Sequence, residues 1–394
     1  MKILSVFGTR PEAVKMAPIV RRLNQTAGIE SHMCVTAQHR QMLDQVLDLF
    51  QIKPDYDLDL MRDNQSLAEL SASIFTHLDR VLADLKPDWV LAVGDTTTVV
   101  TTSLLAFYRR IRFGHVEAGL RTHDKWHPYP EEINRRLATV MADLHFAPTE
   151  WARKNLLHEG VDEKSIRVTG NPVIDAFQFV ALQDEPNEIT SLLDGLNIES
   201  SLALRLRQLA TPLSATIMNE PKTKKLILVT AHRRENFGQP IENICLALKE
   251  LAQREEVEII YPVHLNPNVQ EPVNRILRGI GRVTLLPPLD YLPMVHLMKH
   301  ADLILTDSGG LQEEAPSLGV PVLVLRQTTE RPEGVEAGAL KLVGTETSQI
   351  VREATRLLED PVAYAEMAKA ANPYGDGHAA ERIVEALLRA PNKV

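Results

Sequence analysis

The chain has 394 residues, more than one hydrophobic core ordinarily serves, so two domains are expected. Hydrophobic residues make up 44% and charged residues 24%, as in water-soluble globular proteins. Acidic residues outnumber basic ones by 52 to 43, and the net charge of -9 disfavours a nucleic-acid or anionic-membrane partner. The two cysteines lack metal-ligand spacing and favour a reduced, cytoplasmic protein. No run is long enough to span a bilayer, and the N-terminus resembles a strand rather than a signal peptide.

Short apolar, β-branched runs predict strands in two series, each strand followed by a helical pattern. The first series falls at 2–7, 33–37, 88–93, 112–116, 144–147 and 166–169. The second falls at 226–230, 257–263, 282–286, 302–306, 321–325 and 340–343. Alternation of strands and helices indicates parallel sheets covered on both faces. We therefore predict an α/β protein with two doubly wound, Rossmann-like domains.

The two series set the expected domain boundaries. Residues 1–175 form an N-terminal Rossmann-like domain, and residues 224–361 form a C-terminal one that binds a nucleotide. Between them, residues 176–223 contain no clear strand and are expected to be a linker with surface helices. Residues 362–394 are expected to form a C-terminal helix that packs back on the N-terminal domain.

Polar residues gather where the predicted strands end. In open α/β sheets, ligands bind outside the carboxyl ends of the strands. The strand-end segments are GTRPE (8–12), GDTTT (94–98), HVEAGLRT (115–122), TAHRREN (230–236), PVHLNPN (262–268), TDSGG (306–310) and RQTTERPE (326–333). If the two sheet edges face each other, the cleft between them is the expected site.

The TDSGG segment has the features of an anion-binding turn. A helix is expected to start at Ser308, and the unpaired N–H groups of its first turn would bind a phosphate. Gly309 and Gly310 would let a diphosphate approach the backbone, and Glu314 is placed to hold the two hydroxyls of a ribose. The alternative is a plain N-cap with glycines for packing. The nearby Arg331, also at a strand end, favours a nucleotide.

The GTRPE segment offers a second cationic site. Arg10 could hold a phosphate with two hydrogen bonds, and Lys15 would lie about one turn into the following helix. The alternative is a surface arginine that pairs with Glu12.

Three acids lie on separate segments of the first domain. Asp95 and Glu117 follow strands, and Glu131 opens a helix. Each alone is more simply an N-cap or an ion-pair partner, and Glu132 is as good a helix-capping candidate as Glu131. Three carboxylates converging on one site would instead form acid/base pairs. His232, at a strand end of the second domain, is expected to face them.

Several familiar motifs are missing. The sequence has no GxGxxG after a strand, no Walker A lysine motif, no GxSxG and no cluster with metal-ligand spacing. We therefore expect neither a bound dinucleotide nor a metal, and no cofactor.

Taken together and in this order, the motifs resemble a known family. They are GTRPEAVKMAP, VGDTTT, GHVEAGLRT, PEEINRR, HFAPTE, TGNPVID, TAHRREN, YPVHLNPNV, LTDSGGLQEEAPSLGVPVLVLR, TTERPEGVEAG and NPYGDG. Over nearly its whole length the chain resembles the bacterial non-hydrolysing UDP-N-acetylglucosamine 2-epimerases. The resemblance implies a two-domain glycosyltransferase B-like fold, a homodimer, and reversible conversion of UDP-GlcNAc to UDP-ManNAc for cell-surface polysaccharide synthesis.

The resemblance also assigns residues. The substrate-contacting positions of the family fall on Arg10, Lys15, Asp95, Glu117, Glu131, His232, Ser308, Gly309, Gly310, Glu314 and Arg331. Near the expected uracil, this chain has Leu289 where some relatives have Gln, and Met294 where they have an aromatic residue. Bacterial relatives are activated by a second UDP-GlcNAc, and the residues that match its site are Gln38, Gln41, Arg233 and His264.

The chemistry implied is an elimination. C2 of the sugar is not next to a carbonyl, so its proton is expected to leave as the C1–O bond to UDP breaks, giving 2-acetamidoglucal. Asp95, Glu117 and Glu131 suit the acid/base roles, while Arg10, His232 and the Ser308 helix end suit a cradle for the leaving phosphate. Three alternatives remain open: a hydrolysing epimerase that releases ManNAc and UDP, a glycosyltransferase of the same fold, and a non-catalytic sugar-nucleotide sensor.

Overall fold

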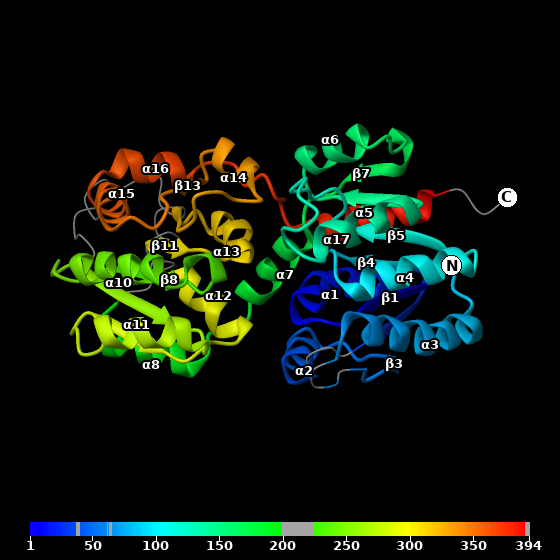
Figure 1. The fold of residues 1–394 in the computed structure, drawn as a ribbon, viewed down its shortest axis with the longest axis horizontal. Helices are drawn as coiled ribbons and strands as arrows, with labels where there is room; N and C mark the ends of the chain where they lie inside the picture. The colour runs from blue at the N-terminus through cyan, green and yellow to red at the C-terminus, as the bar shows by residue number, and fades with distance from the viewer. Residues whose placement is uncertain (37–39, 61, 63–64, 199–223, 391–394) are drawn as a thin grey trace. The chain divides into compact units, whose positions relative to one another are not determined.

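A computed structural model describes residues 1–36, 40–60, 62, 65–198 and 224–390. The chain forms two compact units, Met1–Gln178 with Tyr374–Val394, and Phe179–Pro373 (Figure 1). The second unit extends beyond residue 361, where we predicted its end. Helix α16 (Pro361–Ala368) packs on α15 (Thr347–Glu359) and so belongs to that unit.

The first unit contains a seven-stranded parallel sheet in the order β3-β2-β1-β4-β5-β6-β7. Its strands are β1 (Lys2–Phe7), β2 (Glu30–Val35), β3 (Tyr56–Asp57), β4 (Trp89–Val93), β5 (Arg112–Val116), β6 (Leu144–Ala147) and β7 (Ile166–Val168). The predicted strands are all present, and β3 is an edge strand that the sequence pattern did not reveal. The strand order reverses between β1 and β4, which is the topological switch of a doubly wound sheet.

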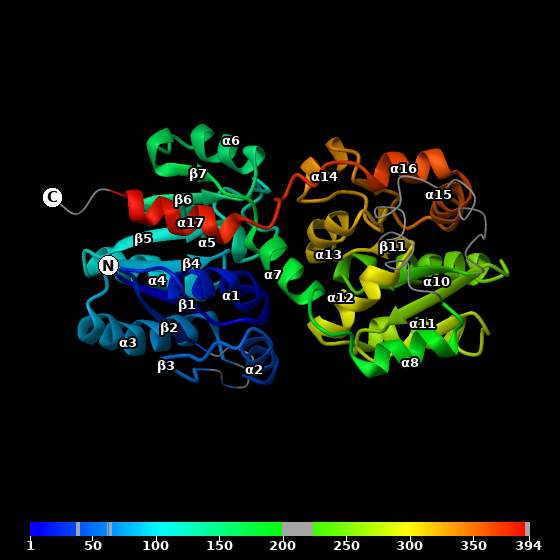
Figure 2. The same ribbon diagram turned by 180° about the vertical axis from the view of Figure 1, so that it is seen from behind.

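Helices cover both faces of this sheet. They are α1 (Arg10–Asn24), α2 (Arg40–Leu49), α3 (Leu67–Leu85), α4 (Thr97–Tyr108), α5 (Glu131–Met141), α6 (Glu150–His158), the first part of α7 (Pro172–Ala181) and α17 (Ala379–Arg389). Apolar residues of α3, α4 and α5 share one core with β1 and β4. Helix α1 packs against α2 and against α17, which joins this unit from the far end of the chain (Figures 1 and 2).

Local sequence signals start these helices where the strands end. Thr9 and Glu12 form a capping box at the start of α1, and Ser66 and Glu69 form another at the start of α3. The Thr149 side chain accepts a hydrogen bond from the first turn of α6.

The second unit contains a six-stranded parallel sheet in the order β10-β9-β8-β11-β12-β13. Its strands are β8 (Lys225–Thr230), β9 (Val257–Pro262), β10 (Val283–Leu286), β11 (Leu303–Thr306), β12 (Val322–Val324) and β13 (Leu340–Leu342). Its helices, besides α15 and α16, are α8 (Asn187–Gly195), α10 (Gln239–Leu251), α11 (Pro267–Leu277), α12 (Tyr291–His300), α13 (Gly309–Glu314) and α14 (Pro332–Glu336). Two doubly wound α/β units are therefore present, as predicted.

The stretch expected to be a linker contributes to the second unit. Helix α8 buries Ile189 and Leu193, so it is an integral part of the fold rather than a surface addition. Residues 199–223 of this stretch lie outside the described residues. Among the helices that are described, none has the length and apolarity needed to cross a membrane.

Candidate functional site

The carboxyl edge of the first sheet gathers residues from three neighbouring strands. Gly8 follows β1, Gly94 follows β4 and Glu117 follows β5, and these strands are adjacent. A side chain at position 8 would place its Cβ 2.0 Å from the Thr36 hydroxyl, so only glycine fits there. The strand ends therefore converge on one edge of the sheet, where parallel α/β proteins bind ligands.

Glu117 is the most enclosed of the three predicted acids. Its residue is 6% exposed, and its backbone has a φ of 61°, in the left-handed region. Lys15 Nζ, on α1, donates to Glu117 Oε1 at 2.5 Å, and Asn171 Nδ2 donates to the same oxygen at 3.0 Å. The structure thus joins two predicted residues, Lys15 and Glu117, and adds Asn171 to them.

Asp95 and Glu131 are joined through helix α5. Arg135 donates to the Asp95 carboxylate at 2.6 Å, and Asn134 Nδ2 donates to the Asp95 carbonyl at 2.9 Å. Glu131 is the first residue of α5 and precedes these two by three and four positions, so it lies on the same face of the helix. Glu131 therefore lies on the face of α5 whose next turn contacts Asp95.

Glu132 has a separate, structural role. It is fully buried, and its carboxylate accepts hydrogen bonds from the backbone N–H groups of Thr122 and His123 and from the Thr122 hydroxyl. It fixes the loop that follows β5 rather than capping its own helix. These contacts give Glu132 a structural function in this loop, and the proposed site residue of the pair remains Glu131.

Glu12 does not pair with Arg10. Its buried carboxylate accepts hydrogen bonds from the N–H groups of Gly8 and Thr9 and from the Thr96 hydroxyl. Burial raises the pKa of Glu12, and these hydrogen bonds oppose that rise. Arg10 is half-buried at the start of α1 and makes no ion pair with any described residue. A cation at a strand end without an ion-pair partner suits an anionic ligand.

His115 lies fully buried in β5, beneath this edge. Its ring nitrogen Nε2 donates to the Gly94 carbonyl at 2.7 Å. Burial lowers the pKa of His115 to about 4, so the imidazole is neutral near pH 7. It fixes the Gly94 turn without adding charge to the site.

In the second unit, Asp307 organises the end of β8. Its side chain is fully buried, and Oδ2 accepts hydrogen bonds from the N–H groups of His232 and Arg233 at 2.8 Å and from Asn236 Nδ2 at 2.9 Å. Asp307 therefore holds the TAHRREN loop against the TDSGG turn. Position 307 was not among the predicted site residues.

His232 is stacked on His264 and faces Asp307. The two imidazole centroids lie 5.3 Å apart with an angle of 16° between the rings, and His232 Nδ1 lies 3.6 Å from Asp307 Oδ1. Burial lowers the pKa of His232, and the Arg233 and His264 charges act in the same direction against the opposing effect of Asp307. A predicted catalytic residue and two predicted regulatory residues, Arg233 and His264, therefore form one cluster.

Arg331 lies over the start of α13. A Cβ at Gly309 would lie 2.8 Å from one terminal nitrogen of Arg331, so the guanidinium needs the space that glycine leaves. Arg331 Nε donates to Glu313 Oε1 at 2.6 Å. Burial would raise the pKa of Glu330, but Arg331 and Arg326 hold it at about 2. The predicted Ser308–Gly310 turn and Arg331 are thus neighbours, in a pocket of ionised groups.

Glu314 lies at the end of α13 and is buried. The Tyr291 hydroxyl, at the start of α12, donates to Glu314 Oε1 at 3.0 Å. Leu289 precedes α12 and Met294 lies within it, and both are half-buried. The predicted ribose-binding carboxylate therefore lies against the helix that carries the predicted uracil contacts.

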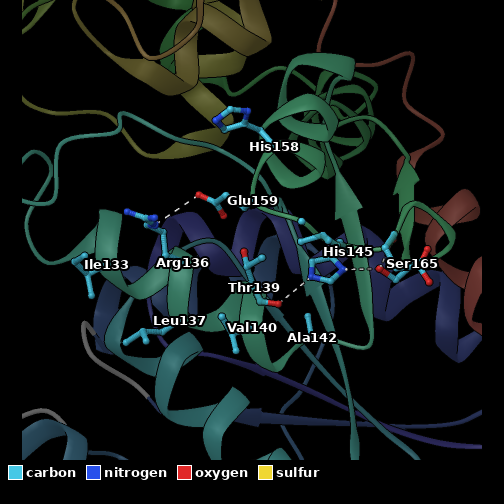
Figure 3. Close-up of a pocket in the computed structure, with 13 residues that line it drawn as sticks. Ile133, Arg136, Leu137, Thr139, Val140, Ala142, His145, His158, Glu159 and Ser165 are labelled. Carbon is cyan, nitrogen blue, oxygen red and sulfur yellow. Dashed lines mark hydrogen bonds and ion pairs between the residues drawn. The ribbon is translucent and has the colours of Figure 1, made fainter.

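A surface groove of about 870 Å³ is present elsewhere in the first unit (Figure 3). Helix α5 and the segment 158–165 line it, and His145 lies in it between Thr139 and Ser165. None of the predicted site residues lines this groove. We therefore assign it no part in the candidate site.

Two predicted regulatory residues cannot be placed. Gln38 and the side chain of Gln41 lie outside the described residues. No group of three or more His, Cys, Asp or Glu residues within the described ranges is arranged to hold a metal ion.

Three residues of the site were not identified from the sequence: Asn171, Asp307 and Tyr291. Asn171 lies in the TGNPVID motif and Asp307 in TDSGG, so both were noticed as parts of motifs without a role of their own. Their partners lie 54 and 71–75 positions away, respectively. Only the fold could show which polar group they contact.

Comparison with known proteins gives a consistent result. The family model for UDP-N-acetylglucosamine 2-epimerase matches residues 21–388. The UDP-N-acetylglucosamine 2-epimerase of Yersinia pestis is 56% identical over 388 residues, which cover 98% of each chain. The protein of the same name from Escherichia coli K12 is 55% identical over 388 residues, with the same coverage.

A solved structure agrees with these relatives. The crystal structure of UDP-GlcNAc 2-epimerase from Neisseria meningitidis bound to UDP-GlcNAc matches with a TM-score of 0.83 and 50% identity, covering 99% of this chain and 100% of that chain. The match confirms the predicted fold class, two doubly wound domains of the glycosyltransferase B type. The family model, the relatives and the fold lead to one conclusion: the chain belongs to the UDP-N-acetylglucosamine 2-epimerase family.

Proposed function

We propose that this protein is a non-hydrolysing epimerase that interconverts UDP-GlcNAc and UDP-ManNAc at C2. The observation that supports it best is the buried Glu117 carboxylate, paired with Lys15, at the same sheet edge as Asp95 and the first turn of α5. Carboxylates held at the ends of adjacent strands can act as a base and an acid on one substrate. In a chain of this family, that chemistry is a proton exchange at C2.

The proposed reaction proceeds by elimination and re-addition. A carboxylate takes the C2 proton, the C–H electron pair forms a C1=C2 double bond, and the C1–O bond breaks with its electrons going to the β-phosphate oxygen of UDP. This leaves 2-acetamidoglucal beside UDP. A second acid then returns a proton to the opposite face of C2 while the phosphate oxygen attacks C1, so no atom is gained or lost. Asp95, Glu117 and Glu131 are the groups to which we assign these proton transfers.

The second unit is proposed to bind UDP. The N–H groups of the Ser308–Gly310 turn, together with Arg331 and His232, would contact the diphosphate, and Arg10 of the first unit would add a cation. Glu314 would accept hydrogen bonds from the ribose hydroxyls, held in place by Tyr291. Stabilising the departing phosphate is typically among the largest contributions to such a reaction.

The test is to incubate the purified protein with UDP-GlcNAc and follow the products by proton NMR. We expect UDP-ManNAc to appear and both nucleotide sugars to reach a stable ratio. Free ManNAc and UDP would instead identify a hydrolysing epimerase. Turnover that needs an added acceptor would identify a glycosyltransferase, and binding without turnover a sensor.

Running the same reaction in deuterated water tests the mechanism. Because a carboxylate exchanges its proton with solvent, the product should carry deuterium at C2. Complete retention of the original hydrogen would contradict the elimination route through solvent-exchanging carboxylates.

The proposed proton-transfer groups can be tested by isosteric substitution. Asp95→Asn, Glu117→Gln and Glu131→Gln should each lower kcat by about two decades or more, the usual contribution of an acid/base group, and leave UDP binding largely unchanged. Near-normal kcat in all three variants would show that the carboxylates are structural.

A second UDP-GlcNAc is proposed to act as an activator. The stacking of His232 on His264 supports this proposal, because a residue proposed to contact the activator then lies against one proposed to contact the substrate. Ligands on such neighbouring sites can change each other's affinity. We expect sigmoidal kinetics in UDP-GlcNAc, flattened by the double variant Gln41→Ala, His264→Ala. Hyperbolic kinetics in the unmodified enzyme, with no lag from pure UDP-ManNAc, would argue against the activator site.

The cellular setting completes the proposal. The protein is proposed to act as a homodimer in the cytoplasm, where its two buried cysteines stay reduced, and to supply UDP-ManNAc for cell-envelope polysaccharide. No cofactor is needed, because the elimination gains and loses no electrons. Light scattering of the purified protein tests the dimer.

A further inference from the structure

Asn171 connects the first sheet to two other parts of its unit. It follows β7, is 1% exposed, and has a hydrogen-bond partner at each of its polar groups. Nδ2 donates to Glu117 Oε1 at 3.0 Å, Oδ1 accepts from the Val173 N–H at 3.1 Å, and the backbone N–H donates to the Tyr374 carbonyl at 2.6 Å. The residue therefore links Glu117, the first turn of α7 and the C-terminal segment that returns to this unit.

The chemistry of these contacts specifies an amide. Val173 N–H needs an acceptor, which Asp, Ser or Thr would supply as well as Asn in the first turn of a helix. Glu117 needs a hydrogen-bond donor. Asp has no donor, and the hydroxyl of Ser is too short to reach Glu117 from this position. To bond both Val173 N–H and Glu117, the side chain must carry an acceptor and also a donor long enough to reach Glu117. The position is therefore matched to Glu117 as well as to the helix.

Glu117 has an unusual local geometry that needs such support. A left-handed backbone costs a non-glycine residue roughly 1–2 kcal/mol, so neighbouring contacts must hold it in place. Lys15 Nζ and Asn171 Nδ2 both donate to Oε1. The other oxygen, Oε2, is directed at Gly94, where a Cβ would come within 3.4 Å of it. Two donors on one oxygen thus set which oxygen points at the Gly94 turn.

We propose that Asn171 is a positioning residue that orients the Glu117 carboxylate for proton transfer at C2. The inference rests on the proposed epimerase function and adds a residue that acts through Glu117. A misplacement of a reacting group by about 1 Å can cost on the order of 100-fold in rate. Loss of the Nδ2 donor should therefore lower kcat by roughly 10- to 100-fold. The affinity for UDP should stay within about twofold of wild type, because Asn171 is not among the residues proposed to contact UDP.

Two substitutions separate orientation from helix capping. Asn171→Ala removes both the donor and the capping oxygen, whereas Asn171→Asp keeps a capping oxygen for Val173 and replaces the donor with a carboxylate oxygen that faces Glu117. Positioning predicts a low kcat in both variants. A capping role alone predicts a normal kcat in Asn171→Asp and a loss of stability in Asn171→Ala. Asn171→Ser also keeps a capping oxygen without reaching Glu117 and adds no charge, so it separates loss of the donor from the effect of the added carboxylate, and it stands alone if Asn171→Asp does not fold.

A substitution within α7 is the matched control. The Asp175 carboxylate accepts hydrogen bonds from the N–H groups of Ala379 and Ala380, at 3.1 and 2.8 Å, and so ties α7 to α17. Asp175→Ala loosens the C-terminal attachment without touching Glu117. It should lower the melting temperature and leave kcat close to wild type.

The experiment uses the full-length chain and measures kcat by NMR, the rate of C2 deuterium incorporation, UDP affinity by calorimetry and the melting temperature. We expect Asn171→Asp and Asn171→Ala to lower kcat and deuterium incorporation together at nearly constant UDP affinity. A wild-type kcat in folded Asn171→Asp or Asn171→Ser would overturn the proposal. So would an equal loss of kcat in Asp175→Ala, which would attribute the effect to the C-terminal attachment. Failure of the proposed function is distinguishable, because the unsubstituted protein would then form no UDP-ManNAc from UDP-GlcNAc.

Discussion

Replacing Asp307 tests whether one buried carboxylate holds two strand-end loops together. Three groups donate to its Oδ2: the N–H groups of His232 and Arg233 and the Asn236 amide. Asp307→Ala leaves these donors without their acceptor in a fully buried position. The variant should be destabilised, and the His232 ring should lose its fixed orientation.

The magnitude follows from the number of donors. Each buried donor left unsatisfied costs about 1–3 kcal/mol, so three would give roughly 3–9 kcal/mol. The bonds from His232 and Arg233 are only part-buried, and Asn236 Nδ2 also donates to the Leu325 carbonyl at 3.1 Å, so the cost lies towards the lower end. Removing the carboxylate also removes the cost of burying its charge, so we expect about 4 kcal/mol, in the lower half of that range. For a unit of this size, 1 kcal/mol corresponds to about 2–4 °C, so the melting temperature should fall by roughly 10 °C.

The matched variant is Asp307→Asn, which keeps an oxygen at the position of Oδ2. Hydrogen bonds to an ionised acceptor are about twice as strong as neutral ones, so this variant should lose about half as much, near 2 kcal/mol. Differential scanning calorimetry of the three proteins, with and without UDP, measures both stability and nucleotide binding. An unchanged melting temperature in Asp307→Ala, or an equal loss in the two variants, would refute the reasoning.

Three further predictions concern single residues of the site. The pKa of His115 falls from 6.5 to about 4 on folding, so as the pH drops the unfolded chain binds a proton on this imidazole before the folded chain does. The free energy of unfolding should therefore decline by up to about 3 kcal/mol between pH 6.5 and pH 4. Urea titrations should show this decline in the wild type and a smaller one in His115→Gln. Gly309→Ala should displace Arg331, because the added Cβ would lie 2.8 Å from a terminal nitrogen of its guanidinium, and should weaken UDP binding about tenfold by calorimetry. Unchanged affinity would contradict this account of the turn. Tyr291→Phe removes the hydroxyl that donates to the buried Glu314 carboxylate and should weaken UDP binding by about 1.5–3 kcal/mol. Unchanged affinity for UDP would argue against a contact between Glu314 and the ribose.

Much of the fold is predictable because its signals are local. Buried parallel strands are short apolar runs, and all twelve predicted ones are present in the two sheets. Capping boxes and strand-end glycines mark where helices begin. The exception is β3, a two-residue edge strand, Tyr56–Asp57, which exists through its pairing with β2 and has no pattern of its own.

The boundary between the units was harder to predict. Helix α7 runs through the division at residues 178–179, and α16 stays with the second unit while α17 joins the first. All are helices of ordinary composition. Which sheet such a helix covers depends on the apolar surface it meets, and the helix's own sequence does not encode that partner.

The sequence by itself determined the residue types at the strand ends, and these predicted a binding site for the phosphates and ribose of a nucleotide. Only the tertiary structure decided which of these residues support one another. Glu132 accepts hydrogen bonds from the loop after β5, Asp307 accepts them from the loop after β8, and Asn171 donates one to Glu117. The physical reason is that a buried polar group must find a partner. That partner is set by which strands lie side by side, and the carboxyl ends of distant strands become neighbours only when the sheet has formed.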